Sequence, residues 1–256
     1  MDLNLNSICA ENYHSNTQIA RILTENWVAQ NMYCPRCGNL HIEQFENNRP
    51  VADFFCPHCH NEYELKSKGD HWGHKITAGS YDAMMERIAS NNNPDFLFLC
   101  YSKSERVVKD FIIIPKHFFT PDVIEKRKPL AQTARRAGWI GCNILIDKIP
   151  KQGKIAIISS GQVVNPAQIV KQLHQSDQLK INNIENRGWM MDILNCINDI
   201  PTQTFLLDEI YAYENILKNK HPQNNHIRPK IRQQLQYLRN KGVIAFLGGG
   251  SYKKII

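Results

Sequence analysis

Four cysteines between residues 34 and 59 have the spacing of a metal site. They form two Cys-x-x-Cys pairs, Cys34–Cys37 and Cys56–Cys59, with eighteen residues between the pairs. Two such turns can each present two thiolates to one tetrahedral Zn²⁺, whereas a redox motif would need only one of them. A structural zinc site made of four sulfurs is therefore predicted. His58 and His60 lie beside the second pair, and either is an alternative to Cys59 as a ligand.

A carboxylate–lysine set is threaded through the same segment and consists of Asp53, Glu64 and Lys66. On a strand, side chains two positions apart point to the same face, so Glu64 and Lys66 would lie together. Asp53 lies in the strand-like stretch 51–55, and a second strand would carry Glu64. Carboxylates of neighbouring strands can hold Mg²⁺, and a lysine can orient water and offset charge during phosphodiester hydrolysis. These residues are the predicted catalytic centre, with Asp53 and Glu64 as magnesium ligands.

The Asp…Glu-x-Lys pattern by itself has low specificity, because alternating Glu and Lys residues are common on exposed strands. Glu62 and Lys68 extend the same face and are the main competing assignments. Asp70, His71 and His74 follow closely, and a role in a loop fits them better.

The composition is that of a globular protein of one large domain or two. Of the 256 residues, 42% are hydrophobic and 21% charged, and no run of eighteen apolar residues predicts a transmembrane helix. The first residues lack the basic and apolar pattern of a secretory signal, so a cytoplasmic protein is expected. In that compartment disulfides are rare, and Cys9, Cys100, Cys142 and Cys196 are expected to be small apolar residues of the interior.

The basic excess is confined to the C-terminal end of the chain. The net charge is +7, yet residues 215–256 contain nine Lys or Arg and no Asp or Glu, which leaves residues 1–214 close to neutral. A block of one charge sign suits a polyphosphate partner, and a solvated basic surface is the simpler alternative.

Hydrophobic patterning divides the chain into two parts. Helices are predicted near residues 17–23, 80–90 and 166–173, and strands at 95–101, 107–115, 142–146 and 154–159. This mixture predicts an α/β domain over residues 1–180. The polar stretch 176–186 is the predicted linker.

The C-terminal part has the order of a winged helix. Helices are predicted at 188–197, 205–213 and 228–240, followed by a hairpin over 243–255 with a glycine tip. The third helix is amphipathic and basic, as a helix that enters a DNA groove must be. An α+β winged-helix domain is therefore predicted over residues 183–256. Its DNA contacts are expected among Arg228, Lys230, Arg232 and Gln233.

Together these residues resemble a known nuclease family. The segment from Asp53 to Lys66 resembles the PD-(D/E)xK nuclease fold with an inserted zinc knuckle, although the proline is Pro50 and is not adjacent to the aspartate. Nearly the whole chain resembles the methyl-directed restriction endonucleases of the Dam-replacing family. The resemblance rests on the cysteine pairs around Asp53 and on residues 64–68, 134–143, 189–192 and 228–232.

The resemblance implies a Mg²⁺-dependent nuclease whose partner is double-stranded DNA with N6-methyladenine in GATC. It implies that Asp53 and Glu64 bind the metal, that Lys66 is the catalytic lysine, and that both domains read methylated DNA. An N6-methyl group lies in the major groove and needs an apolar surface beside a hydrogen-bond acceptor. Trp139, between two glycines and preceded by Arg135 and Arg136, is the candidate for this surface; a core tryptophan is its alternative. Trp189 is expected in the core of its helix.

Two other functions are compatible with the same residues. One is a zinc and winged-helix DNA-binding regulator without catalysis, and the other is a nuclease that is indifferent to methylation. The chain is expected to act as a monomer, because it has no obvious dimerisation helix, and no membrane partner is expected.

Overall fold

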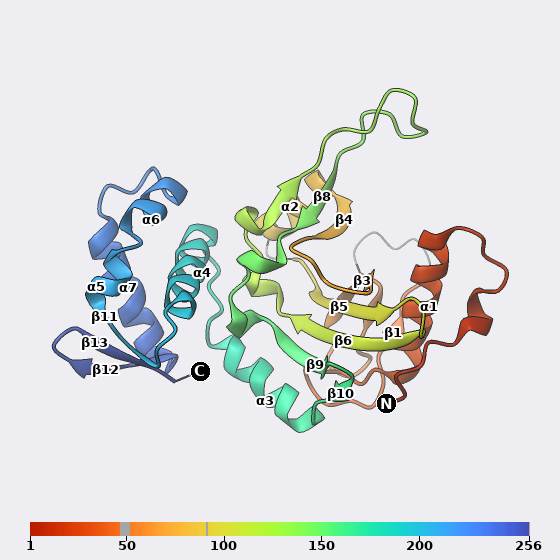
Figure 1. Ribbon diagram of the computed structural model, residues 1–256, viewed down its shortest axis with the longest axis horizontal. Helices are drawn as coiled ribbons and strands as arrows, with labels where there is room; N and C mark the ends of the chain where they lie inside the picture. The colour runs from red at the N-terminus through yellow and green to blue at the C-terminus, as the bar shows by residue number, and fades with distance from the viewer. Residues whose placement is uncertain (47–51, 91, 256) are drawn as a thin grey trace.

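The computed structural model describes residues 1–46, 52–90 and 92–255. The chain forms two lobes along its longest axis, a sheet-rich N-terminal lobe and a mainly helical C-terminal lobe (Figure 1). This agrees with the predicted order of an α/β domain followed by a winged-helix domain. Val51, the first residue of the predicted strand 51–55, and Pro50 before it lie outside the described residues.

A seven-stranded sheet forms the centre of the N-terminal lobe. Its order is β1-β2-β3-β5-β6-β9-β10, and within the described residues only the neighbours β3 and β5 run parallel. Strand β5 is buried along nearly its whole length, as expected of a central strand covered on both faces. The strands are β1 Glu43–Gln44, β2 Phe54–Phe55, β3 Glu62–Gly69, β5 Asp95–Ser102, β6 Val107–Ile114, β9 Ile155–Ser159 and β10 Gln162–Val163.

Helices cover both faces of this sheet. Helix α1 (Asn16–Asn31) and helix α3 (Pro166–Asp177) share one hydrophobic core with Leu97 and Leu99 of β5. Helix α2 (Tyr81–Ser90) shares the other core with Phe96 and Phe98. Alternate residues of one strand therefore supply two separate cores, as the period of two requires.

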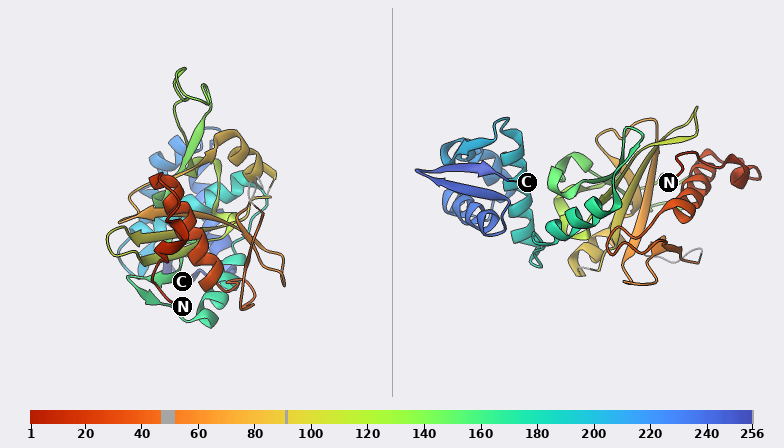
Figure 2. Two further views of the ribbon diagram at one scale, coloured as in Figure 1. Left: turned by 90° about the vertical axis from the view of Figure 1, so that its right-hand side faces the viewer. Right: turned by 90° about the horizontal axis from the view of Figure 1, so that it is seen from below.

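A second, smaller sheet extends the same lobe. Its order is β4-β8-β7, with β4 Ile76–Ser80, β7 Ile124–Lys126 and β8 Gly141–Ile144. Residues 127–140 join β7 to β8 as a long hairpin that projects from the body of the protein (Figures 1 and 2). Five short 3-10 helices complete the lobe within the described residues: η1 Ser7–Ala10, η2 Lys116–Phe118, η3 Pro121–Val123, η4 Ile146–Lys148 and η5 Lys151–Gly153.

The C-terminal lobe differs from the predicted winged helix in one segment. Residues 205–213 were expected to form one helix, but Phe205 lies in strand β11 (Thr204–Leu206), and two helices follow, α5 (Leu207–Tyr211) and α6 (Glu214–Lys220). The reason is tertiary, because β11 pairs with the second strand of the hairpin and completes a three-stranded sheet. The other elements are α4 Ile184–Asp199, α7 Ile227–Asn240, β12 Ile244–Gly248 and β13 Ser251–Lys254.

The two lobes share hydrophobic core. Trp189 of α4 is fully buried, as predicted, in the same apolar cluster that contains Phe118 and Phe119 of the N-terminal lobe. Polar contacts reinforce the junction: the Arg187 side chain donates to the carbonyl of Phe119 (3.0 Å) and Asn195 donates to that of Lys148 (2.9 Å). Among the described residues, no helix combines the length and the apolar character needed to cross a membrane.

Candidate active site and metal centre

The four predicted cysteine ligands lie together. Their sulfur atoms are all within 4.8 Å of one another, and neither His58 nor His60 belongs to the group. Each pair of cysteines is held by the same local turn. Gly38 N–H donates to the carbonyl of Cys34 (2.8 Å), and His60 N–H donates to that of Cys56 (2.9 Å). Both turns close with a positive φ, 78° at Gly38 and 56° at His60.

The chemistry of this cluster fits Zn²⁺, which favours four thiolates in a tetrahedron. Burial raises the pKa of Cys34. Burial also acts on Cys56, but backbone N–H groups of Cys59 and His58 point to its sulfur and lower its pKa overall. The cluster could therefore hold a zinc ion, and a bound cation would favour the thiolates further.

A buried ion pair ties the cysteine turns to the main sheet. Arg36, between the first two cysteines, donates to both carboxylate oxygens of Asp95 at 2.7 and 3.0 Å. Asp95 begins β5, is completely buried, and also accepts from the Lys116 N–H and the Asn61 side chain. Burial raises the pKa of Asp95, but Arg36 outweighs it and the pKa is lowered overall. Tyr63 of β3 is the sheet neighbour of Asp95. Asp95 therefore anchors both the cysteine turns, through Arg36, and the strand that carries Glu64.

The structure brings the three predicted catalytic residues together. Glu64 and Lys66 lie on β3 with Leu65 buried between them, and Lys66 Nζ is 2.5 Å from Glu64 Oε1. Asp53 lies just before β2, and its Oδ2 accepts a hydrogen bond of 2.6 Å from the Leu65 N–H. A second backbone bond joins Asp53 N–H to the carbonyl of Tyr63 (2.9 Å). Asp53 is thus held against the segment of β3 that carries Glu64 and Lys66.

Burial and charge oppose each other at this site. Burial raises the pKa of Asp53, although Lys66 and the Leu65 N–H act in the other direction. Burial lowers the pKa of Lys66, but Glu64 and Asp53 outweigh it, and the pKa is raised overall. The two carboxylates and the ammonium therefore form a partly buried group of interacting charges.

Further residues of the site could not be singled out from the sequence. A cavity of about 500 Å³ opens beside Asp53 and Lys66, and α1 forms its other wall with Arg21, Thr24 and Glu25. Burial raises the pKa of Glu25, and the charge of Asp53 adds to this effect. On the other side, Arg87 Nη1 of α2 lies 3.6 Å from Glu64 Oε2. Glu25 and Arg87 lie on helices with many other polar side chains. Their sequence context does not distinguish them, so only the fold identifies them as part of the site.

Lys68, one of the two competing assignments, and the neighbouring Asp70 and His74 have partners outside the centre. Lys68 Nζ donates to the carbonyls of Trp72 (2.6 Å) and Lys75 (3.1 Å), so it holds a loop. Asp70 pairs with Lys103, and His74 pairs with Asp147.

Comparison with protein families assigns both lobes. The DpnI family model, described as the Dam-replacing family, matches residues 1–182, and a model described as the Dam-replacing helix-turn-helix (HTH) domain matches residues 185–254. The chain belongs to the Dam-replacing family. This membership supports a restriction nuclease with a DNA-binding HTH tail.

In this member of the Dam-replacing family, the predicted DNA contacts of the N-terminal lobe lie on the projecting hairpin. Arg135 and Arg136 are exposed and lie in the end of the hairpin that is closed by the Gly138 N–H bond to the carbonyl of Leu130 (3.1 Å). Trp139 lies at its base, half-buried, where Leu130 N–H donates to its carbonyl (2.9 Å). A Cβ atom on Gly141 would come within 2.8 Å of the indole, so the glycine makes room for the ring. Trp139 is therefore neither fully exposed nor a core residue.

The four predicted DNA contacts of α7 fall into two groups. Arg232 and Gln233 are exposed. Arg228, in contrast, donates to Glu214 (2.8 Å) and lies over the ring of Tyr211, and Lys230 donates to Asn186 (2.9 Å). Arg232 and Gln233 are thus more available to an external ligand than Arg228 and Lys230.

Proposed function

We propose that this protein is a Mg²⁺-dependent endonuclease that cuts double-stranded DNA at GATC containing N6-methyladenine. The observation that carries the proposal is the meeting of Asp53, just before β2, with Glu64 and Lys66 of β3; Asp53 and Lys66 line an open cavity of about 500 Å³. Membership of the Dam-replacing family supports the same chemistry. The proposed domains are residues 1–180 for cleavage and 183–256 for DNA binding, in a monomer.

Asp53 and Glu64 would hold the magnesium ion. They supply carboxylate oxygens, the ligands that Mg²⁺ prefers. When bound, the ion would neutralise charge on the phosphate and lower the pKa of a bound water. The Leu65 N–H fixes one Asp53 oxygen at 2.6 Å and leaves the other available.

Lys66 would act on the substrate side of the centre. Its ammonium lies 2.5 Å from Glu64, close enough to the carboxylates to donate to an attacking water and to offset charge on the phosphate. The four cysteines would hold a structural zinc ion, which stabilises the turns around Asp53 rather than taking part in the reaction. The ion pair of Arg36 with Asp95 would hold these turns against β5, next to β3.

DNA would contact both lobes. Arg135 and Arg136 on the hairpin suit phosphates or guanine edges, and the half-buried Trp139 offers an apolar edge for an N6-methyl group. In the tail, Arg232 and Gln233 would face a groove. Arg228 and Lys230 would either hold α7 in place or exchange their protein partners for phosphates.

Digestion of a GATC plasmid tests the proposal. Adenine-methylated and unmethylated forms are compared with Mg²⁺, using the wild type, Lys66→Ala, and Lys68→Met as a control for the competing lysine. The proposal expects cutting of the methylated plasmid only, lost in Lys66→Ala and kept in Lys68→Met. Cutting of both forms would leave a nuclease indifferent to methylation. Binding without cutting by the wild type would favour a zinc and winged-helix regulator.

A further inference from the structure

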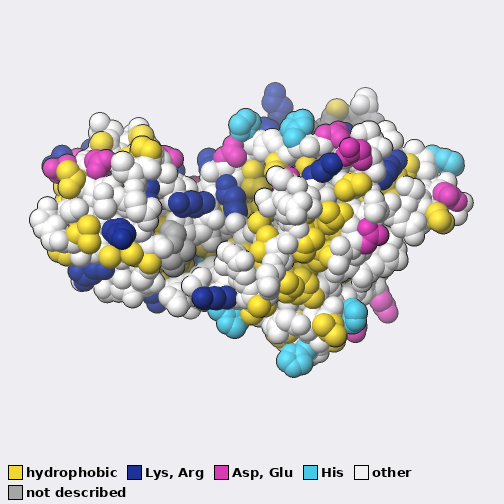
Figure 3. Space-filling model, turned by 60° about the horizontal axis from the view of Figure 1, so that its bottom comes forward, with side chains coloured by type: hydrophobic (Ala, Val, Ile, Leu, Met, Phe, Trp, Pro, Cys, Tyr) yellow, Lys and Arg dark blue, Asp and Glu magenta, His cyan; other side chains and the backbone are white. Residues whose placement is uncertain are grey.

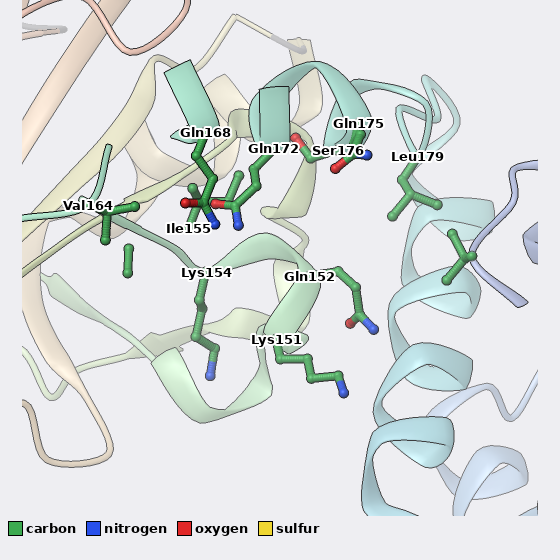
Figure 4. A pocket seen from close by; sticks show the side chains of 12 residues that line it. Lys151, Gln152, Lys154, Ile155, Val164, Gln168, Gln172, Gln175, Ser176 and Leu179 are labelled. Atoms are coloured by element: carbon green, nitrogen blue, oxygen red, sulfur yellow. The ribbon is translucent and has the colours of Figure 1, made fainter. Parts of the chain in front are cut away.

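A second cleft lies at the junction of the two lobes, away from the carboxylate–lysine centre. Seen from below, several Lys and Arg side chains gather at this junction (Figure 3). The cleft has a volume of about 480 Å³ and lies between α3, the segment from η5 to β9, and Val243, which follows α7 (Figure 4). This volume is in the range of sites for small molecules. None of Asp53, Glu64 and Lys66 lines it.

One wall of the cleft is basic. It carries Lys151 and Lys154, and no Asp or Glu lines the cleft. Within the part of the chain that the structure describes, neither lysine has an ion-pair partner at 4.0 Å or less. Burial lowers the pKa of Lys154, and the distant carboxylate of Asp147 only partly opposes this. An anion bound in the cleft would therefore offset the cost of burying the Lys154 ammonium without a partner.

The opposite wall carries a row of amides. Gln168, Gln172 and Gln175 recur at helical spacing on one face of α3, and all three line the cleft. Among the described residues, none of their side-chain amides has a hydrogen-bond partner. Each amide has two N–H donors and one carbonyl acceptor, so this wall can pair with a ligand edge that presents both. Gln152 is different, because it exchanges two hydrogen bonds with Asn198 of α4 (3.1 and 3.0 Å) and fixes the rim.

The floor between these walls is apolar. Ile155, Leu179 and Val243 are almost completely buried, and Val164 extends the surface. A phosphate alone would use the lysines and leave the floor and the amides without partners. The cleft instead suits a ligand with an anionic group, a flat apolar face and a polar edge.

We propose that this cleft binds a nucleoside phosphate, with the phosphate at Lys151 and Lys154 and the base on the apolar floor against the glutamines of α3. The ligand is either a free mononucleotide or the 5′-phosphorylated end of a DNA strand, which present the same chemistry. Because Val243 belongs to the C-terminal lobe and Gln152 is bonded to α4, a bound nucleotide touches both lobes. The inference does not depend on the nuclease activity proposed for the other site.

Calorimetric titration of the full chain tests this site, without added Mg²⁺ so that no strand is cut. The probes are dAMP, deoxyadenosine, inorganic phosphate, and a 5′-phosphorylated single-stranded tetranucleotide with its unphosphorylated counterpart. Binding of dAMP at one site per chain is expected, at least about tenfold tighter than deoxyadenosine or phosphate. If only the 5′-phosphorylated tetranucleotide binds, the ligand is a strand end.

Variants assign the binding to the cleft. Lys154→Gln and Gln172→Ala are each expected to weaken binding by about tenfold, and the exposed Gln175→Ala is a second amide variant in case Gln172→Ala does not fold. The matched controls are Lys171→Ala and Gln178→Ala, which do not line the cleft and are expected to bind as the wild type does. The proposal is overturned if neither dAMP nor the phosphorylated tetranucleotide binds at millimolar concentration. Binding that is equal in cleft and control variants also overturns it.

Discussion

In the four-cysteine cluster, all the ligand atoms lie within 4.8 Å of one another, whereas in the carboxylate–lysine centre Glu64 is paired with Lys66 and Asp53 with a backbone N–H. The cluster is made by two short turns with matching backbone hydrogen bonds. The centre instead depends on strand pairing, because β3 pairs with both β2 and β5. The cluster is thus suited to stabilise the fold. The centre instead contains partly buried charged groups that could act on a substrate.

The largest expected effect comes from removing the metal from the cluster. Chelation, or Cys56→Ala, should destabilise the fold by at least about 5 kcal/mol, because a structural zinc site contributes its binding free energy to folding. The melting temperature should fall by roughly 10–20 °C, measured by calorimetry with the zinc content. Cys9→Ala, outside the cluster, is the control. An unchanged melting temperature after chelation would mean that the cluster has no structural metal.

The anchor between cluster and sheet should come next. Arg36→Met leaves Asp95 buried without its partner, and breaking such a pair costs about 3–5 kcal/mol. Arg21→Met removes a pair with Glu25 in which the arginine side chain is 57% exposed, for which about 0.5 kcal/mol is expected. Urea unfolding compares the two variants. Equal losses would show that the Arg36 pair does not hold the cysteine turns to the sheet.

Acid should act on the same anchor through His117, which lies beside it. Burial lowers the pKa of His117 to about 4, against the charges of Asp95 and Asp177. The unfolded chain therefore takes up this proton first, and stability should be lost as the pH falls from about 6.5 to 4, by up to about 3 kcal/mol. His117→Gln keeps a donor for the carbonyl of Ser176 and should flatten this part of the stability profile. Identical pH profiles for the two proteins would contradict the prediction.

The smallest effect should have the opposite sign. Asp53→Asn, in buffer without Mg²⁺, should raise stability slightly, because burial raises the pKa of this carboxyl and its charge is unfavourable in the fold. Asparagine keeps an oxygen for the Leu65 N–H. The same substitution at Asp95, whose pKa is lowered, should reduce stability. Thermal unfolding of both variants measures whether stability rises or falls. A loss of stability in Asp53→Asn would contradict the prediction that the Asp53 charge destabilises the fold.

Local patterns predicted most of the elements because they depend on neighbouring residues. The spacing of the cysteines, the apolar run of β5 and the amphipathic face of α7 are all visible in short windows, and the structure has each of them. The meeting of Asp53 with Glu64 and Lys66 also followed from strand alternation. Their catalytic roles remain predictions.

The features that the sequence did not predict depend on distant contacts. Strand β11 exists because Phe205 pairs with Tyr252, and the sheet β4-β8-β7 joins residues 76–80 to residues 141–144. Glu25 and Arg87 reach the centre only because α1 and α2 pack on opposite faces of the main sheet. The ion pair of Arg36 with Asp95 spans 59 positions and has no local signature.

The hydrophobic cluster that runs from Phe118 to Trp189 has a consequence for how the chain comes apart. Two lobes joined by a flexible tether would melt independently, and each could be produced alone. Here the separation of the lobes would expose the apolar side of α4 and the aromatic residues around η2 to water. The protein should therefore unfold in a single cooperative transition, and a fragment that ends near residue 180 should be prone to aggregation even though it contains the whole carboxylate–lysine centre.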